Sequence, residues 1–319
     1  MAVSLSIFEI CDGLLNNEIY IHGLENNLQR IISNMGGLTT ASKTIGVRSS
    51  RLKEWKYGRS PIPLSILKKL VLLFPKEKKL VDSADIYLSC RYSAHILKFP
   101  KVVSEDLAYI IGLILGDGSL SGDSHNSKGN WGARVFFDNE LHQSVYDDLV
   151  MREFGIMPKH YRDGENCHCS YFGSKVFHQF LRNYFGICNG FKCDKIEVPG
   201  RILASNNRIV ISFLRGLFDS DGTITSQGYV KYSSTSKKIA GQVKGLLEGY
   251  GLKPRLSIWV KNNKYLPLYS VELRKKESVL RFAQLIGFRH PVKSGKLMGF
   301  RNIYSNSQPR SLAAKDSAL

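Results

Sequence analysis

Two mostly apolar segments of the chain repeat the same order of apolar, small and acidic positions. Residues 110–118 read IIGLILGDG, and residues 214–222 read LRGLFDSDG. Each has a small residue at its third and seventh places and ends in Asp-Gly. The two acidic residues before the final glycine, Asp117 and Asp221, are 221 − 117 = 104 residues apart. A repeat of this length indicates a duplicated structural unit.

The small residues of each segment are four positions apart, so they lie on one face of a helix. Glycine costs about 1 kcal/mol relative to alanine inside a helix, and close contact with another helix is the usual compensation. We therefore expect two helices packed side by side, with an aspartate at the same end of each. Gly118 and Gly222 suit the left-handed position that ends a helix. The predicted helix interface consists of Gly112, Gly116, Gly216 and Ser220.

The downstream patterns of the two units also agree. Strand-like residues follow at 132–137 and 228–232, and amphipathic helices follow at 140–154 and 237–250. Two further strands and a last helix complete each unit. The sequence therefore predicts an α+β fold with two pseudo-symmetric αββαββα repeats, whose eight strands form a saddle of antiparallel sheets around the paired helices.

Two aspartates at the ends of adjacent helices are electrostatically unfavourable without a cation. Each carboxylate meets the negative end of a helix dipole, and the two carboxylates repel each other. A shared divalent metal removes both problems, and oxygen-only ligation points to Mg²⁺. Such a pair of acids can activate water against a phosphodiester. The alternative is that Asp-Gly only ends each helix.

The paired segments resemble the motifs of the LAGLIDADG homing endonucleases in their single-chain, two-repeat form. The resemblance covers residues 107–304, about two thirds of the chain, and Leu115 departs from it where the name-giving motif has an acid. It implies a site-specific endonuclease that cuts double-stranded DNA. Such an enzyme is a hydrolase that takes part in intron homing, and it acts as a monomer. The resemblance also implies Mg²⁺ as cofactor, with Mn²⁺ as an alternative, at a site made by Asp117, Asp221, Gly116 and Ser220.

Members of that family often carry an active-site lysine from each repeat. Lys192 lies five residues after Ile187, and Lys293 lies five residues after Phe288, so the two lysines are equivalent in the repeats. The resemblance assigns them to the catalytic site beside Asp117 and Asp221, where they would stabilise charge on the phosphate. A lysine that only positions phosphate is the alternative.

The charge balance favours nucleic acid as the partner. The formal net charge is +18 and the pI is about 9.6, which is typical of proteins that bind double-stranded DNA or RNA. Period-two alternation sends some basic strand residues to one face of a sheet. The candidate DNA contacts of the repeats are Arg134, Lys231, Tyr232, Arg255, Lys261, Lys264 and Arg274.

The first hundred residues lack the repeat and predict a small all-α domain similar to the helix-turn-helix of phage repressors. Residues 38–44 and 49–57 are expected to form two helices around a turn at 45–47, and residues 64–74 a third. The alternative is a helical bundle with a charged exterior that binds nothing. The candidate DNA contacts of this domain are Arg48, Arg51, Lys53 and Lys56.

These patterns divide the chain into an N-terminal domain, two repeats and a disordered tail, with bounds 1–100, 101–203, 204–304 and 305–319. The longest apolar runs, such as residues 107–115, are too short to span a bilayer. No secretory signal is visible at the N-terminus. We therefore expect an intracellular protein that does not contact a membrane. It would be in the cytoplasm or in an organelle or nucleoid.

Six cysteines occur, and four of them lie close together in the sequence. Cys167, Cys169, Cys188 and Cys193, with His168, could form a zinc site. Free buried thiols are the favoured interpretation, because Cys167 and Cys169 fall on a predicted strand and the second repeat has ordinary residues there.

Two other functions stay open at this point. A non-cleaving DNA-binding transcription regulator could carry the same two kinds of domain, although such regulators have lost acidic residues. An RNA maturase that assists splicing would bind intron RNA instead of, or in addition to, DNA. An intein is not expected, because the chain begins with Met-Ala-Val and ends with Ala-Leu.

Overall fold

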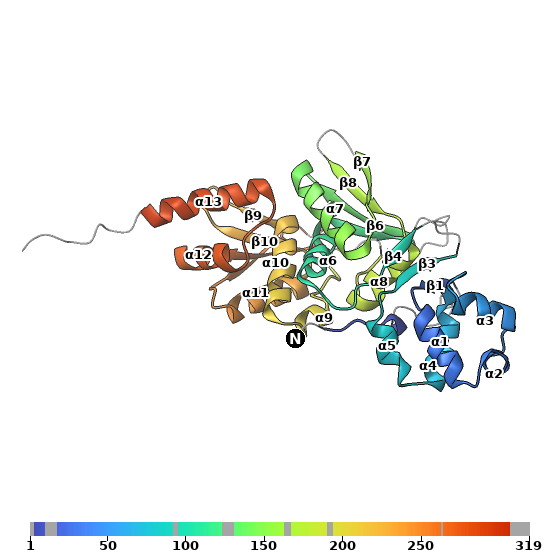
Figure 1. Ribbon diagram of the computed structural model, residues 1–319. Coiled ribbons are helices and arrows are strands. Elements are labelled where there is room, and N and C mark those ends of the chain that lie inside the picture. Colours follow the sequence, from blue (N-terminus) through green and yellow to red (C-terminus); the bar gives the residue numbers. More distant parts are fainter. Residues whose placement is uncertain are drawn as a thin grey trace, which may run out of the picture.

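The computed structural model describes residues 3–9, 18–91, 95–122, 131–162, 167–189, 194–262 and 264–306. Within these ranges the fold is α+β, with three four-stranded antiparallel sheets (Figure 1). No helix in the described ranges has the length and apolar character needed to cross a membrane.

The N-terminal module combines short helices with a small sheet of order β2-β1-β3-β4. The expectation of an all-α domain was therefore wrong. These strands have two to four residues each, which is too short for a clear alternation in the sequence. The elements are η1 (Ile7–Glu9), β1 (Ile19–His22), α1 (Glu25–Asn34), α2 (Leu38–Ile45), α3 (Ser49–Lys56), β2 (Ile62–Pro63), α4 (Leu64–Leu73), α5 (Glu77–Ser83), β3 (Tyr87–Cys90) and β4 (Ile96–Lys98).

The three helices that the sequence suggested in this module are present within a residue of their expected bounds. Gly46 ends α2 in the left-handed conformation, with φ of 73°, so the chain turns sharply into α3. Ala41, Leu52 and Trp55 are buried between the helices. The basic residues of α3 consequently lie on its outer side.

The first repeat begins with the motif helix and has the sheet order β5-β6-β8-β7. Its elements follow the predicted αββαββα order. They are α6 (Glu105–Asp117), β5 (Gly118–Ser121), β6 (Gly132–Phe137), α7 (Glu140–Phe154), β7 (Lys159–Arg162), β8 (His168–Phe172) and α8 (Lys175–Phe185).

The second repeat has the same order of elements and the equivalent sheet, β9-β10-β12-β11. A short helix, α9 (Gly200–Leu203), precedes it, and a long helix, α13, extends it to residue 306, so residues 305 and 306 are helical where a tail was expected. The rest of that expected tail, residues 307–319, lies outside the described residues. The elements are α10 (Asn207–Asp221), β9 (Gly222–Ile224), β10 (Val230–Ser234), α11 (Lys237–Gly249), β11 (Arg255–Trp259), β12 (Leu268–Leu273), α12 (Lys276–Leu285) and α13 (Pro291–Asn306).

The motif helices α6 and α10 pack against each other between the sheets of the two repeats (Figure 1). A Cβ on Gly216 would lie 2.2 Å from the carbonyl oxygen of Tyr109, and a Cβ on Gly116 would lie 1.9 Å from the hydroxyl oxygen of Ser220. Such distances leave no room for a side chain at either glycine. The two backbones therefore approach as closely as the spacing of small residues suggested.

The glycines that follow the motif aspartates do not adopt the expected left-handed conformation. Gly118 and Gly222 have φ values of −94° and −88°, because a strand begins at each of them directly after the helix. They are glycine for a different reason. A Cβ on Gly118 would lie 2.6 Å from the carbonyl oxygen of Ile114, and a Cβ on Gly222 would lie 2.3 Å from that of Phe218.

The N-terminal module is joined to the repeats by backbone and side-chain contacts. The amide of Leu5 donates to the carbonyl of Lys101 at 2.8 Å, and Lys175 on α8 pairs with Glu18. Strand β3 also contacts α8. The helices α2 and α3 therefore have a defined position relative to the first repeat (Figure 1).

Candidate active site

The two motif aspartates lie at the same end of the helix pair. Asp117 is the last residue of α6 and is exposed, whereas Asp221 is the last residue of α10 and is half-buried. One carboxylate oxygen of Asp221 lies 3.3 Å from the position of a Cβ on Gly116, the residue that directly precedes Asp117. The packing of small residues thus brings both acids to one seam between the repeats.

A cavity of about 240 Å³ opens beside Asp117 at this seam. Both repeats contribute to it. Its lining residues are Asp117, Phe136, Phe137, Asp138, His142, Cys167, Asp219, Ser220 and Lys293.

Lys293, near the start of α13, inserts its ammonium at the carboxyl end of α10. The ammonium donates to the carbonyl oxygens of Asp219 at 2.6 Å and Ser220 at 2.9 Å. Burial lowers the pKa of Lys293, while the negative charges of Asp219, Asp117, Asp138 and Asp221 raise it. The side-chain nitrogen of Lys293 therefore lies among the acids of the seam. Lys192, its expected partner in the first repeat, lies outside the described residues.

A third aspartate, which the sequence did not single out, is buried beside the seam. Asp219 is only 2% exposed, and the Tyr109 hydroxyl of α6 donates to its carboxylate at 2.6 Å. His142 of α7 contacts the same hydroxyl at 2.9 Å. Burial raises the pKa of Asp219 and lowers the pKa of His142 to about 3. The partners come from distant parts of the chain, and no local spacing in the sequence announces them.

The donor groups at the seam fit a hard divalent cation. Asp117 and Asp221 offer carboxylate oxygens, and Mg²⁺ typically takes one or two carboxylates and completes its shell with water and substrate phosphate. Within the described ranges, no three His, Cys, Asp or Glu side chains are placed to enclose a metal. The seam therefore suits an ion held partly by substrate and water. The main-chain oxygen of Ser220, an expected ligand, accepts from Lys293.

Comparison with known protein families gives a match within the second repeat. Residues 208–287 match the family model described as LAGLIDADG-like domain. The match extends from α10 through α12. The match includes Asp221, and the repeated architecture extends the same pattern to Asp117.

The chain is also similar to parts of longer proteins. A DNA polymerase of Thermococcus hydrothermalis is 29% identical over 196 residues, which are 59% of this chain and 11% of that protein. The chain therefore spans about a tenth of the length of this relative.

Solved structures with a similar arrangement include variants of the homing endonuclease I-DmoI. A mesophilic variant of I-DmoI is 19% identical and has a TM-score of 0.45, with 58% of this chain and 96% of that chain covered. I-DmoI in complex with DNA and Mn is 20% identical, with a TM-score of 0.42 and coverage of 58% and 97%.

The sheet of the first repeat exposes a basic and aromatic face. Arg134 on β6 lies opposite Tyr171 on β8, with its guanidinium 5.5 Å from the ring centroid. Tyr161 on β7 lies 6.0 Å from the same ring. Neighbouring Val135 points the other way and is buried. The sequence analysis named Arg134 as a candidate DNA contact and named neither tyrosine.

In the second repeat, Lys231 and Arg274 both pair with Glu272, with nitrogen–oxygen distances of 3.8 Å and 2.5 Å. Lys231 and Glu272 are opposite each other in the register of β10 and β12. Tyr232 points to the other side, is fully buried and packs 5.7 Å from the ring of Phe218. The prediction that Tyr232 contacts DNA was therefore wrong, because adjacent strand residues face opposite sides.

The remaining candidate DNA contacts are at the surface. Arg255 is exposed at the start of β11, and Lys261 and Lys264 are exposed beyond its end. In the N-terminal module, Arg48, Arg51 and Lys53 are exposed, and Lys56 is half-buried. These positions are compatible with contact to a phosphate backbone.

Three of the four cysteines considered for zinc are described. Cys169 is buried, and Cys167 and Cys188 are half-buried, all as free thiols. Cys193 lies outside the described residues. In the part of the chain that the structure describes, no three-ligand cluster surrounds the cysteines.

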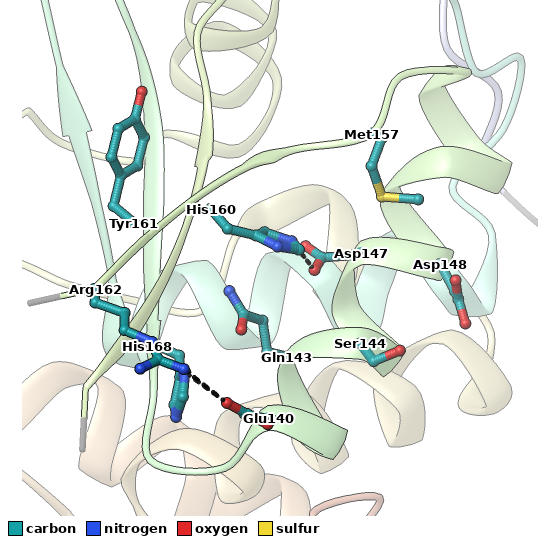
Figure 2. A pocket seen from close by; sticks show the side chains of 10 residues that line it. All are labelled: Glu140, Gln143, Ser144, Asp147, Asp148, Met157, His160, Tyr161, Arg162 and His168. Carbon is teal, nitrogen blue, oxygen red and sulfur yellow. Dashed lines mark hydrogen bonds and ion pairs between the residues drawn. The ribbon is translucent and has the colours of Figure 1, made fainter. Parts of the chain in front are cut away.

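A second cavity, of about 420 Å³, lies on the first repeat between α7 and β7 (Figure 2). Its centre is Asp147, which is 3% exposed and accepts from Ser170 at 2.8 Å. His160 Nε2 lies 2.7 Å from the other carboxylate oxygen, as Figure 2 shows. Burial raises the pKa of Asp147. These groups satisfy each other and link β7 and β8 to α7, so we interpret them as structural.

Proposed function

We propose that this protein is a site-specific, metal-dependent endonuclease of double-stranded DNA. The observation that carries the proposal is the pairing of α6 and α10, which brings Asp117 and Asp221 to one seam beside a cavity. No structural requirement of the helix pair explains an acid at both helix ends, because each acid meets the negative end of a dipole. The presence of both acids is explained if they hold a divalent cation against a phosphodiester.

In this proposal Asp117 and Asp221 hold the divalent cation, Mg²⁺ or Mn²⁺, with the main-chain oxygen of Gly116 as a further ligand. The main-chain oxygen of Ser220, which the sequence also suggested as a ligand, accepts from Lys293 instead. The bound cation would supply water activation and charge neutralisation at the phosphate. Lys293 holds a positive charge at the same seam, where it can stabilise negative charge on the substrate. Asp117 and Asp221 come from one chain, so a monomer is sufficient for cutting both strands.

In this proposal the sheets of the two repeats supply the surface that contacts DNA. Arg134, Lys231 and Arg274 are basic residues on strands or strand ends, and the tyrosines near Arg134 add stacking or hydrogen-bonding groups. Many weak contacts spread along a duplex give a long recognition site with strong salt dependence. We propose that the N-terminal module, residues 1–100, extends this contact through α3.

Retention of both motif acids supports cleavage over a regulator that only binds. A binding surface needs no carboxylates, since acids at the centre of a DNA-facing seam repel phosphate. A cation-dependent nuclease needs them.

The test is selection of cleaved molecules from a randomised duplex library. The full chain is incubated with the library and Mg²⁺, and the new ends are captured by adapter ligation and sequenced. A shared sequence enriched by the wild type, and by neither Asp117→Asn nor Asp221→Asn, is the expected result. If the wild type enriches no sequence, or if both variants enrich the same one, the proposal fails.

A further inference from the structure

The buried polar cluster beside the seam breaks the symmetry of the two repeats. The repeat spacing of 104 residues pairs Asp219 with Leu115 (219 − 115 = 104) and Tyr109 with Phe213 (213 − 109 = 104). His142 is the third residue after the Asn139 cap of α7, and Ile239 is the third after the Ser236 cap of α11. At each of these places one repeat has a polar side chain where the other has an apolar one.

The carboxylate of Asp219 uses both of its oxygens. One oxygen accepts from the Tyr109 hydroxyl at 2.6 Å and from the amide of Arg289 at 3.0 Å. The other accepts from the amide of His290 at 3.2 Å. Residues 289 and 290 directly precede α13. The side chain of Asp219 therefore fixes the start of the helix that carries Lys293.

The main chain of Asp219 binds the other end of the same short segment. Its carbonyl oxygen accepts from the Lys293 ammonium at 2.6 Å. One residue thus anchors both the beginning of α13 and the charged group three residues further along. In the first repeat, Leu115 has no carboxylate with which to make such a clamp.

Two histidines complete the cluster and join it to the first repeat. Because the Tyr109 hydroxyl donates its one proton to Asp219, it accepts from Nε2 of His142 at 2.9 Å. His290 accepts at Nδ1 from the amide of Lys293, at 3.4 Å, so its Nε2 donates to Asp138 at 2.8 Å. The position of α13 is thereby tied to α6, to α7 and to the residue that follows β6.

We infer that Asp219 is a positioning residue that fixes the Lys293 ammonium at the seam for the cleavage of one of the two strands. The inference rests on the proposed endonuclease function. It makes the start of α13 and the Lys293 ammonium one unit that a single residue of α10 holds in place. Asp219 itself touches neither substrate nor metal in this assignment.

The first experiment measures the two strands separately. A duplex containing the selected target carries a different fluorophore on each strand, and single-turnover rates are compared for the wild type, Asp219→Asn and Tyr109→Phe. A misplaced ammonium should slow one strand by about 100-fold and leave the other nearly unchanged, with KM unaltered. Asp147→Asn is the matched control, because it also removes a buried, hydrogen-bonded carboxylate and should leave the ratio of strand rates as in the wild type.

The second experiment needs no activity. Lys293 is acylated with an N-hydroxysuccinimide ester and the modification rate is followed by mass spectrometry. Asp219→Asn should increase the rate at Lys293 severalfold and leave that at exposed Lys237 unchanged. Equal slowing of both strands, or an unchanged acylation rate at Lys293, overturns the positioning role. A wild type that cuts no duplex, together with a raised acylation rate in the variant, refutes the proposed function and leaves the clamp itself intact.

Discussion

The carbonyl oxygen of Phe213 lies 2.4 Å from the position that a Cβ on Gly112 would occupy. Gly216 has the reciprocal relationship with Tyr109 on the opposite helix. No side chain fits between two backbones at this separation, so the distance between α6 and α10 is set by the two glycines. The position of both motif aspartates depends on that distance.

Alanine at Gly112 or Gly216 should therefore destabilise the protein, by about 1–3 kcal/mol for an overpacked core. The clash exceeds the gain of about 1 kcal/mol that alanine brings to a helix interior. Urea unfolding monitored by circular dichroism measures the difference. The matched control is Gly245→Ala on α11, where a Cβ has no neighbour within 4 Å; that variant should be more stable than the wild type. Equal effects at Gly112 and Gly245 would contradict the packing argument.

Substitution of either motif acid should remove cleavage while DNA binding persists. Asp117→Asn and Asp221→Asn keep the shape of the side chain and remove the charge that a divalent cation needs. Cleavage of the selected target and binding to it in Ca²⁺ are measured side by side. Asp148→Asn, an exposed acid on α7, should retain full cleavage. An active Asp221→Asn protein would show that this acid has another role.

Acidification should weaken the fold through His142. The pKa of this buried histidine is lowered from 6.5 to about 3, first by burial and then by the charges of His290 and Lys293, against the opposite effect of Asp138. A lowered histidine pKa means that the folded state prefers the neutral ring. The contribution of the neutral His142 to the free energy of unfolding is complete above pH 6.5. It is lost as the pH falls toward 3, on the order of 1 kcal/mol per pH unit.

His142→Gln keeps a side-chain N–H for the Tyr109 hydroxyl and cannot titrate in this range. The free energy of unfolding, measured in urea at pH 7.5, 6 and 5, should fall less steeply for this variant than for the wild type. Parallel curves for the two proteins would show that His142 is not the group responsible.

The sequence was sufficient for features that depend on local periodicity and failed where distant residues meet. The helix at 140–154 and the strand at 132–137 match the structure because their apolar spacing is regular. Tyr232 was assigned to the wrong face, since alternation places neighbours on opposite sides without saying which side is inner. The contact of Tyr109 with Asp219 joins residues 110 positions apart, and neither residue's immediate neighbours indicate it. The short strands of the N-terminal module are stabilised by pairing, which leaves little trace in two to four residues.

DNA binding should depend on salt through the basic residues of the two sheets. Binding that neutralises six or more phosphates loses a factor on the order of 10³ between 50 and 200 mM salt. The double variant Arg134→Ala and Lys231→Ala removes two exposed or half-exposed cations from the strands that carry the proposed DNA surface. Each lost phosphate contact should reduce the slope of log K against log salt by about 0.9. Fluorescence anisotropy with a labelled duplex measures this slope, and Lys237→Ala on α11, outside that surface, serves as the control. An unchanged slope in the double variant, or an equal change in the Lys237 variant, would place the DNA on another surface.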